Sequence, residues 1–276
     1  MALVARDVSY TYAGGRSFGV EALRSVDLSL KREDLVVVTG TTGSGKSTLL
    51  RLLAGLLAPS QGTVAVDGMD PSAREARGSV AIVFQDPETQ FFAETLHADV
   101  MFGPRNLGLD YASEEADRAL RTVGLDPDIY GGRSPFMLSG GEARRGAIAG
   151  ALAMAAPYLL LDEPTSGLDA DGRRSIREAL AAERRRSGVL VVTHDPMEFL
   201  DEATAVVALD SGAVAFSGTP QELYADPAPY TRAGLELPPV VRTQLLVRDA
   251  GMRLEHVVCD PARAAESLLT ARGASS

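Results

Sequence analysis

A run of nine residues, Gly40 to Thr48, has the composition of a loop that binds nucleotide phosphates. Two glycines separated by four residues precede a lysine and a hydroxyl residue, which is the phosphate-loop pattern. Glycines let successive backbone N–H groups converge on a phosphate, and the lysine adds a full positive charge. The Ser47 hydroxyl is also a candidate Mg²⁺ ligand. The residues expected to contact phosphate are Gly40, Thr42, Gly43, Ser44, Gly45, Lys46, Ser47 and Thr48.

An acidic pair, Asp162-Glu163, directly follows the apolar run 158–161. If that run is a strand, both carboxylates emerge at its carboxyl end, where ligands bind in open α/β sheets. Asp162 is then a candidate Mg²⁺ ligand, and Glu163 is a candidate general base that polarises an attacking water. A solvated turn is the ordinary explanation of such a pair, but the phosphate loop favours the catalytic interpretation.

Two more polar residues end predicted strands at the same edge of the sheet. Gln85 follows the run 80–84, and its amide could contact the metal or the water. His194 follows the run 189–193, and a ring N–H there could reach the terminal phosphate. His97 and His256 have no comparable placement, so we expect them to be structural or exposed to solvent.

A second glycine-rich run, Leu138-Ser139-Gly140-Gly141-Glu142, opens a predicted helix. Ser139 can cap that helix, and an ordinary capped helix start is the simplest explanation. However, the two glycines leave the backbone open to an anion, which helix N-termini attract. A chain that already has a complete phosphate loop has no evident need of another. We therefore predict that this run contacts the nucleotide of a second molecule.

The elements that must position these residues alternate between buried strands and helices. Continuous apolar runs at 35–39, 158–161 and 189–193 predict strands buried on both faces of a sheet. Helical periodicity is found at 47–57, 113–123, 141–155 and 172–186. The pattern predicts an α/β fold with a mainly parallel sheet. The segment from about 86 to 155 is expected to form an inserted α-helical subdomain.

Composition narrows the possible function classes. The net charge of −10 disfavours a nucleic-acid-binding protein and direct docking on anionic lipid. The single cysteine, Cys259, excludes an intrachain disulfide, and we expect it to be a buried free thiol. Charge comes too early for a signal peptide, and the weakly polar run 146–161 is too short to span a bilayer. We therefore expect a soluble protein of a reducing compartment.

With these features, residues 1 to about 220 resemble the ATP-binding subunits of ABC transporters, with Gly40–Thr48 as the Walker A loop and Leu138–Glu142 as the signature sequence. The resemblance implies an N-terminal antiparallel β subdomain beside a P-loop NTPase core. It also implies roles for single residues. These are Gln85 in the Q-loop, Asp162 at the end of Walker B, Glu163 as catalytic base, Asp169 in the D-loop beside ATP, His194 as switch histidine, and Tyr12, with Tyr10 as the alternative, stacked on adenine.

A narrower resemblance is to the energy-coupling factor (ECF) and cobalt-type importers. It is based on the runs 84–92 and 99–104, on Ser166–Asp169, and on the run 234–240 near the end of the chain. In such subunits the C-terminal tail helps two ATPases to associate. We accordingly expect residues 1–220 to form the ATPase domain and residues 221–276 a small C-terminal extension with a possible role in dimerisation.

Three departures from the family pattern stand out: Thr42 where Asn is common, Glu142 where Gln is commoner, and Glu33-Asp34 where a Gly-Glu turn is usual. Glu142 would bring negative charge toward ATP unless it is paired, and Arg145 is the expected partner. Every residue with a direct catalytic role is nevertheless present, so we expect an active enzyme.

The resemblance implies two ATPase subunits that sandwich two ATP molecules, each with Mg²⁺. The second subunit is identical or paralogous. An integral membrane component and a substrate-binding membrane subunit complete the machine, which places the chain at the cytoplasmic face of the cell membrane, with no nucleic acid. The expected function is to power import of a metal ion or a vitamin. The alternative is a soluble ABC ATPase acting on ribosomes or DNA, which the acidic charge and the single cassette disfavour.

Overall fold

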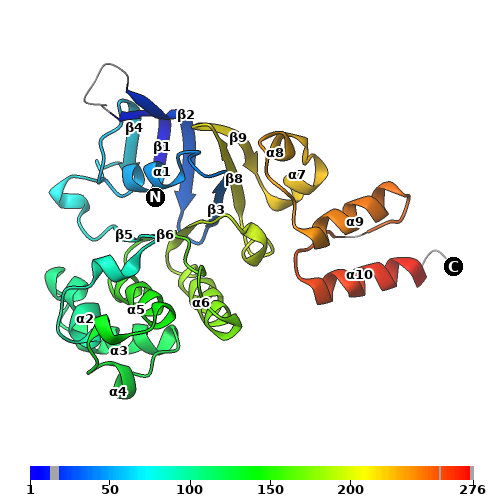
Figure 1. Ribbon diagram of the computed structural model, residues 1–276. Helices are drawn as coiled ribbons and strands as arrows, with labels where there is room; N and C mark the ends of the chain where they lie inside the picture. Colours follow the sequence, from blue (N-terminus) through cyan, green and yellow to red (C-terminus); the bar gives the residue numbers. More distant parts are fainter. Residues whose placement is uncertain (13–18, 255, 274–276) are drawn as a thin grey trace.

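The computed structural model describes residues 1–12, 19–254 and 256–273. Its centre is a six-stranded sheet in the order β5-β6-β7-β3-β8-β9 (Figure 1). The first five of these strands run parallel, and β9 pairs antiparallel with β8. The strands are β3 (Leu35–Gly40), β5 (Val80–Val83), β6 (Tyr158–Asp162), β7 (Gly188–Val192), β8 (Ala205–Asp210) and β9 (Ala213–Gly218). The α/β fold with a mainly parallel sheet is therefore confirmed.

The continuous apolar runs of the sequence form the middle of this sheet. Every residue of β3, β6 and β7 is buried, because helices and the second sheet cover both faces. Strands covered on both faces need apolar side chains at every position rather than at alternate ones. The carboxyl ends of β6, β7 and β3 lie next to one another, so the residues that follow these strands share one edge.

A small antiparallel sheet has the order β2-β1-β4, with bounds β1 (Ala2–Tyr12), β2 (Val20–Lys31) and β4 (Gln61–Val66). Its strands alternate between buried and exposed residues, as a sheet with one covered face requires. The buried side chains, including Leu3, Val8 and Leu30, pack in one cluster with Leu49 and Leu53 of α1 (Lys46–Leu53). This packing holds the small sheet beside the helix that follows the phosphate loop.

A layer of helices lies below the sheet edge in Figure 1. It consists of α2 (Leu96–Asn106), α3 (Ala112–Thr122), α4 (Pro127–Tyr130) and α5 (Gly140–Ala153). Small residues let α5 pack closely against α2, since a Cβ atom on Gly146 would stand 2.9 Å from Leu96 Cδ1. Further along the chain, α6 (Ala170–Glu183) packs its Ile176 and Leu180 into the same core.

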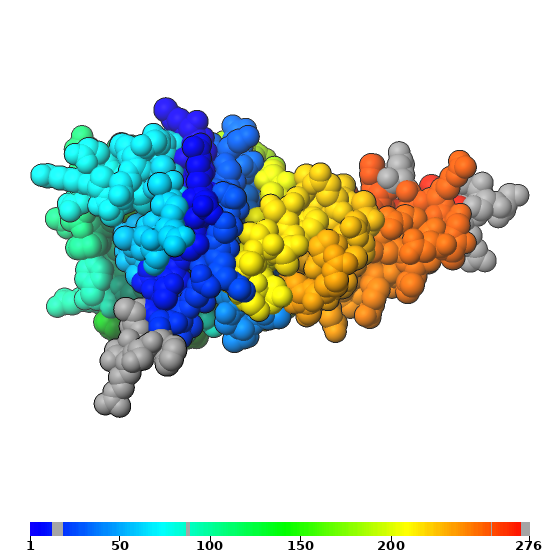
Figure 2. Space-filling view, turned by 90° about the horizontal axis from the view of Figure 1, so that it is seen from above, coloured from blue at the N-terminus to red at the C-terminus, as the bar shows by residue number. Residues whose placement is uncertain are grey.

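The C-terminal part is more helical than its proline-rich sequence suggests. The described residues after β9 form α7 (Pro220–Ala225), α8 (Ala228–Arg232), α9 (Pro239–Asp249) and α10 (Pro261–Gly273). Prolines stand at the first positions of α7, α9 and α10, where the missing N–H costs no hydrogen bond. The clustered prolines of this region thus mark helix starts. Figure 2 shows α9, in orange, at one end of an elongated molecule.

Candidate functional site

The loop between β3 and α1 has the backbone of a phosphate-binding loop. Gly45 has φ +101°, and a Cβ atom there would stand 2.5 Å from the carbonyl oxygen of Ala22, so only glycine fits. Gly43 is also left-handed, at φ +80°. Among the described residues, the buried Oγ atom of Ser44 has no hydrogen-bond partner. A buried hydroxyl of this kind is suited to a phosphate oxygen.

Lys46 begins α1 and turns its ammonium group back over the loop. Its Nζ donates to the carbonyl oxygens of Gly40 and Thr41, both at 2.8 Å. Burial lowers the pKa of Lys46, while the Glu163 and Asp162 carboxylates act in the opposite direction. The lysine therefore stands between the loop and the acidic pair.

Ser47 and Asp162 meet as the sequence pattern requires of a Mg²⁺ site. Ser47 Oγ donates to Asp162 Oδ2 at 2.9 Å. Burial raises the pKa of Asp162, with the Ser47 hydrogen bond opposing this effect. Within the described ranges, no cluster of three or more His, Cys, Asp or Glu residues could enclose a metal. One carboxylate and one hydroxyl nevertheless suit Mg²⁺, which draws its other ligands from phosphates and water.

Glu163 is held at every polar atom. Its carboxylate accepts hydrogen bonds from the backbone N–H of His194 at 2.9 Å and from Thr193 Oγ1 at 3.3 Å. His194 Nδ1 also lies 2.9 Å from Glu163 Oε1, although the histidine side chain is 72% exposed. Glu163 itself has φ +51°, an unusual backbone conformation for a non-glycine residue. His194 thus directly contacts the candidate base.

Gln85 lies at the same edge, after β5. It lines a hollow of about 310 Å³ together with Ser47, Asp162 and Arg51. Its exposed side chain and the Ser47–Asp162 pair therefore share one space. Because Arg51 faces the hollow from the end of α1, a cation already stands near the candidate metal position.

Tyr12 is placed at the edge of the phosphate loop. Its hydroxyl shares a hydrogen bond of 3.2 Å with Thr48 Oγ1, and its ring stands edge-on to Tyr10 at 4.8 Å. The ring is 37% exposed. A partly exposed aromatic ring beside the loop is suited to stacking on a nucleotide base.

The signature residues form a capped helix start in the helical layer. Ser139 Oγ accepts from Glu142 N at 3.3 Å, and Glu142 Oε2 accepts from Ser139 N at 2.8 Å. This backbone hydrogen bond is the main cause that lowers the pKa of Glu142. Ser139 and Gly140 are exposed, and a Cβ atom on Gly140 would meet no described atom within 4 Å. The surface over this helix end is therefore open.

The expected pairing of Glu142 with Arg145 is wrong. Arg145 Nη1 donates instead to the carbonyls of Val123 and Gly124, at 3.3 and 3.0 Å. The capping box satisfies Glu142 within its own helix turn, and Arg145, also three residues away, is turned instead to carbonyls at the end of α3. Glu142 therefore stabilises the helix start, and its charge is turned toward Ser139.

Asp169 is the cap of α6. Its Oδ1 accepts from Gly172 N at 2.7 Å, and Arg173 Nη1 donates to the Leu168 carbonyl at 2.8 Å. These bonds fix the loop 166–169, which is separated from the acidic pair by two residues. A Cβ atom on Gly141 would stand 3.3 Å from Leu168 Cδ2, so the signature helix and this loop are neighbours.

Sequence reasoning missed Arg144, Thr193 and Arg51. Arg144 Nη1 donates to the Glu163 carbonyl at 2.5 Å, and its Nη2 donates to the Gln85 carbonyl at 2.9 Å. Backbone carbonyls are present at every position, so no residue type signals such a partner. Thr193 ends an apolar run that predicts a strand, and no local pattern marks its hydroxyl as functional. Its contact to Glu163 arises because β6 and β7 are neighbours in the sheet.

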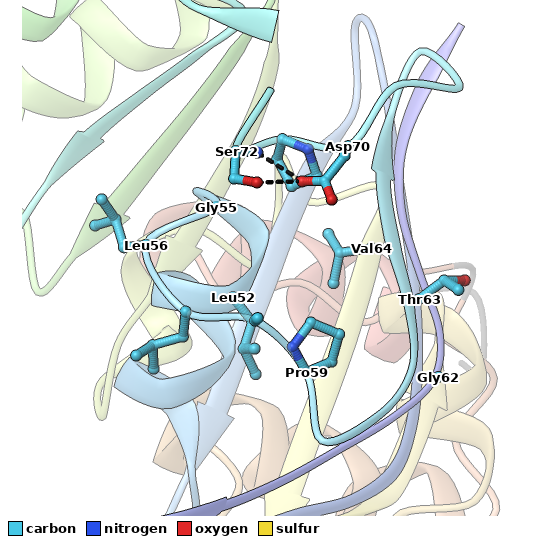
Figure 3. Close-up of a pocket in the computed structure, with 12 residues that line it drawn as sticks. Leu52, Gly55, Leu56, Pro59, Gly62, Thr63, Val64, Asp70 and Ser72 are labelled. Atoms are coloured by element: carbon cyan, nitrogen blue, oxygen red, sulfur yellow. Dashed lines mark hydrogen bonds between the residues drawn. The ribbon is translucent and has the colours of Figure 1, made fainter. Parts of the chain in front are cut away.

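A second hollow, of about 260 Å³, lies near the other end of α1 (Figure 3). It is lined by Leu52, Val64 and Pro59, with Asp70 and Ser72 at one side. Asp70 Oδ1 is already used by the backbone and side chain of Ser72, at 2.8 and 2.7 Å. None of the phosphate-loop or acidic residues lines it, so it does not belong to the candidate site.

The fold and the site together define a P-loop nucleoside triphosphatase, with its phosphate loop, acidic pair and histidine at one edge of a parallel sheet. A family model described as ABC transporter matches residues 23–166. The chain is 43% identical to the energy-coupling factor transporter ATP-binding protein EcfA2 of Symbiobacterium thermophilum, over 91% of this chain and 90% of that protein. It is 35% identical to EcfA2 of Clostridioides difficile, over 98% and 97%.

Among solved structures, cbiO1 from Clostridium perfringens, part of the ABC transporter complex cbiONQ, is similar with a TM-score of 0.69. It shares 31% identity over 88% of this chain and 98% of its own. The chain belongs to the ABC transporter ATP-binding proteins, in the energy-coupling factor group. Its activity is ATP hydrolysis coupled to transport, and the comparisons do not favour the alternative of a ribosome- or DNA-directed ATPase. Each helix of the described residues is too short or too polar to span a bilayer.

Proposed function

We propose that this chain hydrolyses MgATP as one of two ATP-binding subunits that drive import of a metal ion or a vitamin. The observation that carries the proposal is the meeting of Ser47, Asp162 and Glu163 at one sheet edge, beside a glycine loop with an unpartnered buried hydroxyl. The open, capped start of α5 supports the need for a second subunit.

The residues of the loop would hold the nucleotide as follows. Backbone N–H groups of Gly43–Thr48 and the positive end of α1 would bind the β-phosphate. Lys46 would exchange its bonds to the loop carbonyls for phosphate oxygens. Tyr12 would stack on the adenine ring. Ser47, Asp162 and Gln85 would hold Mg²⁺, which when bound supplies charge neutralisation at the phosphates.

Glu163 would act as the general base toward the attacking water. Its carboxylate is already oriented by Thr193 Oγ1 and the backbone N–H of His194. These two donors hold the carboxylate at the sheet edge, on the side of the phosphate loop. The exposed His194 ring would turn from Glu163 to the terminal phosphate when ATP is present.

The signature residues would complete the site of the other subunit. Ser139, Gly140 and Gly141 present an exposed helix N-terminus, which favours a phosphate through its N–H groups and its dipole. Glu142 does not prevent this, because its carboxylate is bonded back to Ser139 N. Asp169, at the start of α6, would line the same interface. Each ATP would thus lie between Walker A of one subunit and the signature of the other.

The assembly would include membrane components. The relatives are named as ATP-binding proteins of transporters, and cbiO1 is described as part of a transporter complex. We propose attachment to an integral membrane partner at the cytoplasmic face of the membrane, with substrate specificity in another polypeptide. Residues 1–220 would form the ATPase domain, with its helical subdomain at about 86–155, and residues 221–276 an extension that helps the two ATPases associate.

The test is to purify the tagged chain from detergent-solubilised membranes of the cells that encode it. We expect MgATP hydrolysis that is lost in Lys46→Ala, and co-purification of an ABC ATPase subunit and an integral membrane protein. Recovery of ribosomes with no membrane protein would contradict the transport proposal. Hydrolysis that survives Lys46→Ala would contradict the assignment of the loop.

A further inference from the structure

Arg144 connects the signature helix to the hydrolytic site. It lies in the first turns of α5, five residues after Ser139, and its guanidinium is half-buried. One terminal nitrogen donates to the carbonyl of Glu163 at 2.5 Å, and the other donates to the carbonyl of Gln85 at 2.9 Å. One side chain of the helical layer thus joins the backbones of two residues that follow sheet strands β6 and β5.

Arg144 contacts Glu163 where the backbone of this candidate base has an unusual conformation. Glu163 has φ +51°, which an L-residue adopts only when its surroundings hold it there. Its N–H donates to the Val192 carbonyl at 2.9 Å, and Ser166 N donates to its carbonyl at 3.2 Å. Those partners belong to the sheet and the following turn. Among the described residues, Arg144 is the residue of the helical layer that hydrogen-bonds to Glu163.

The second contact of Arg144, to Gln85, also holds a backbone carbonyl that lies beyond the end of a strand. Gln85 is exposed and follows the end of β5, so its own strand no longer fixes its backbone. Arg144 holds the carbonyl of Gln85 with the same planar group that holds Glu163. Because a guanidinium is rigid, it fixes the spacing of the two carbonyls as well as their positions.

We propose that Arg144 is a positioning residue that aligns the base Glu163 with Gln85 and links both to the signature helix. This rests on the proposed function for the roles of Glu163 and Gln85. A phosphate bound at the start of α5 would order the first turns of this helix, and Arg144 would pass that order to the chain's own base. A small displacement of a general base strongly reduces turnover. Nucleotide binding should change little, because other residues contact the nucleotide.

Arg145 provides a matched control. It is the adjacent arginine of the same helix, and it also donates to two backbone carbonyls, those of Val123 and Gly124. Its partners lie at the end of α3, within the helical layer. Removing Arg145 should therefore cost packing and stability without displacing Glu163 or Gln85.

The experiment compares Arg144→Ala, Arg144→Lys, Arg144→Gln and Arg145→Ala in the membrane-purified complex, assayed well below each melting temperature. We expect Arg144→Ala to lower kcat by about tenfold or more, with KM for ATP within about threefold of wild type. Arg144→Lys, which can reach one carbonyl at a time, should be intermediate. Arg145→Ala should keep kcat within about twofold. If the alanine variant does not fold, the lysine and glutamine variants decide.

Amide hydrogen exchange supplies a readout that does not depend on activity. The Ser166 N–H donates to the same carbonyl as Arg144, so it should exchange several-fold faster in Arg144→Ala and unchanged in Arg145→Ala. Wild-type kcat in the Arg144 variants, or an equal kcat loss in Arg145→Ala, would overturn the inference. An inactive wild-type complex would contradict the proposed function instead, and the exchange at Ser166 would then decide the role of Arg144.

Discussion

At the scale of single residues, the site places two buried carboxylates side by side, and their burial lowers the stability of the fold. Asp162 and Glu163 are buried carboxylates, 5% and 8% exposed, beside the partly buried Lys46. Burying charge is unfavourable unless it is compensated, and here the donors are the Ser47 and Thr193 hydroxyls and the backbone N–H of His194. Sites of this kind trade stability for activity.

Asp162→Asn should stabilise the nucleotide-free protein while abolishing most hydrolysis. Since burial raises the pKa of Asp162, its ionised form destabilises the fold, and stability falls as pH rises through the folded-state pKa. The amide removes this charge and can still accept from Ser47. We expect a melting temperature a few degrees higher, since about 1 kcal/mol corresponds to about 2–4 °C in a chain of this size.

Hydrolysis by the same variant should fall about 100-fold or more, because a metal ligand and its charge are lost. Asp171→Asn, on an 80% exposed side chain, is the matched control and should change neither quantity appreciably. Calorimetry and a phosphate-release assay measure the two effects. A variant that is less stable and fully active would contradict the assignment of Asp162.

Cys259 should be unreactive in the folded protein. It is 2% exposed, its thiol lies 3.3 Å from the Tyr224 hydroxyl, and burial raises its pKa to about 11. The nucleophilic thiolate is therefore scarce at pH 8. We expect an aromatic disulfide reagent to label it at least about 100-fold more slowly than in denaturant, with the rate rising toward pH 11. Rapid labelling of the native protein at pH 8 would show that the C-terminal helices do not cover it.

At the scale of elements, helix starts and strand ends create the site. The phosphate loop, the acidic pair and His194 follow β3, β6 and β7, which are adjacent parallel strands. Three chain segments far apart in the sequence therefore meet at one edge. The open helix start of α5 is a further element of this kind, and its capping box gives it a rigid shape.

Ser139→Ala should destabilise α5 by about 1 kcal/mol, since an N-cap hydroxyl is lost. Glu142→Gln should be within about 0.5 kcal/mol of wild type, because glutamine can still accept from Ser139 N. Urea denaturation of the nucleotide-free protein measures both values. An equal loss in the two variants would mean that the charge of Glu142, rather than the box, stabilises the helix start.

Much of this arrangement could be predicted because it depends on local signals. The continuous apolar runs mark β3, β6 and β7, and the residues at their ends form the candidate site. Glu142 was assigned the wrong partner because two local pairings competed, and only the geometry of the helix start decides between them. Arg144 was missed because its partners are carbonyls. The helices α7 to α10 were not predicted, because prolines are common both at helix starts and in loops.

At the scale of the whole molecule, the C-terminal helices are tied to the nucleotide-binding core. The buried Tyr230 of α8 packs in one cluster with Val206 and Ala208 of β8, the strand that pairs with β3. Asp201 accepts from the backbone N–H groups of Cys259 and Asp260, at 2.6 and 2.8 Å. These contacts connect the C-terminal helices with the strand beside β3 and with the segment after His194. The C-terminal helices therefore pack against elements that lie next to the candidate site.

The central claim is that two subunits share each ATP and that Glu163 ends their association by hydrolysis. The most direct measurement is the mass of Glu163→Gln, by light scattering, with and without saturating MgATP. If the second subunit is an identical chain, the variant alone suffices; if it is the ATPase that co-purifies, that subunit is added. We expect a monomer without nucleotide, a stable ATP-bound dimer with it, and loss of this dimer in the Lys46→Ala background. A Glu163→Gln protein that stays monomeric with either partner at saturating ATP would contradict both the shared site and the assignment of the base.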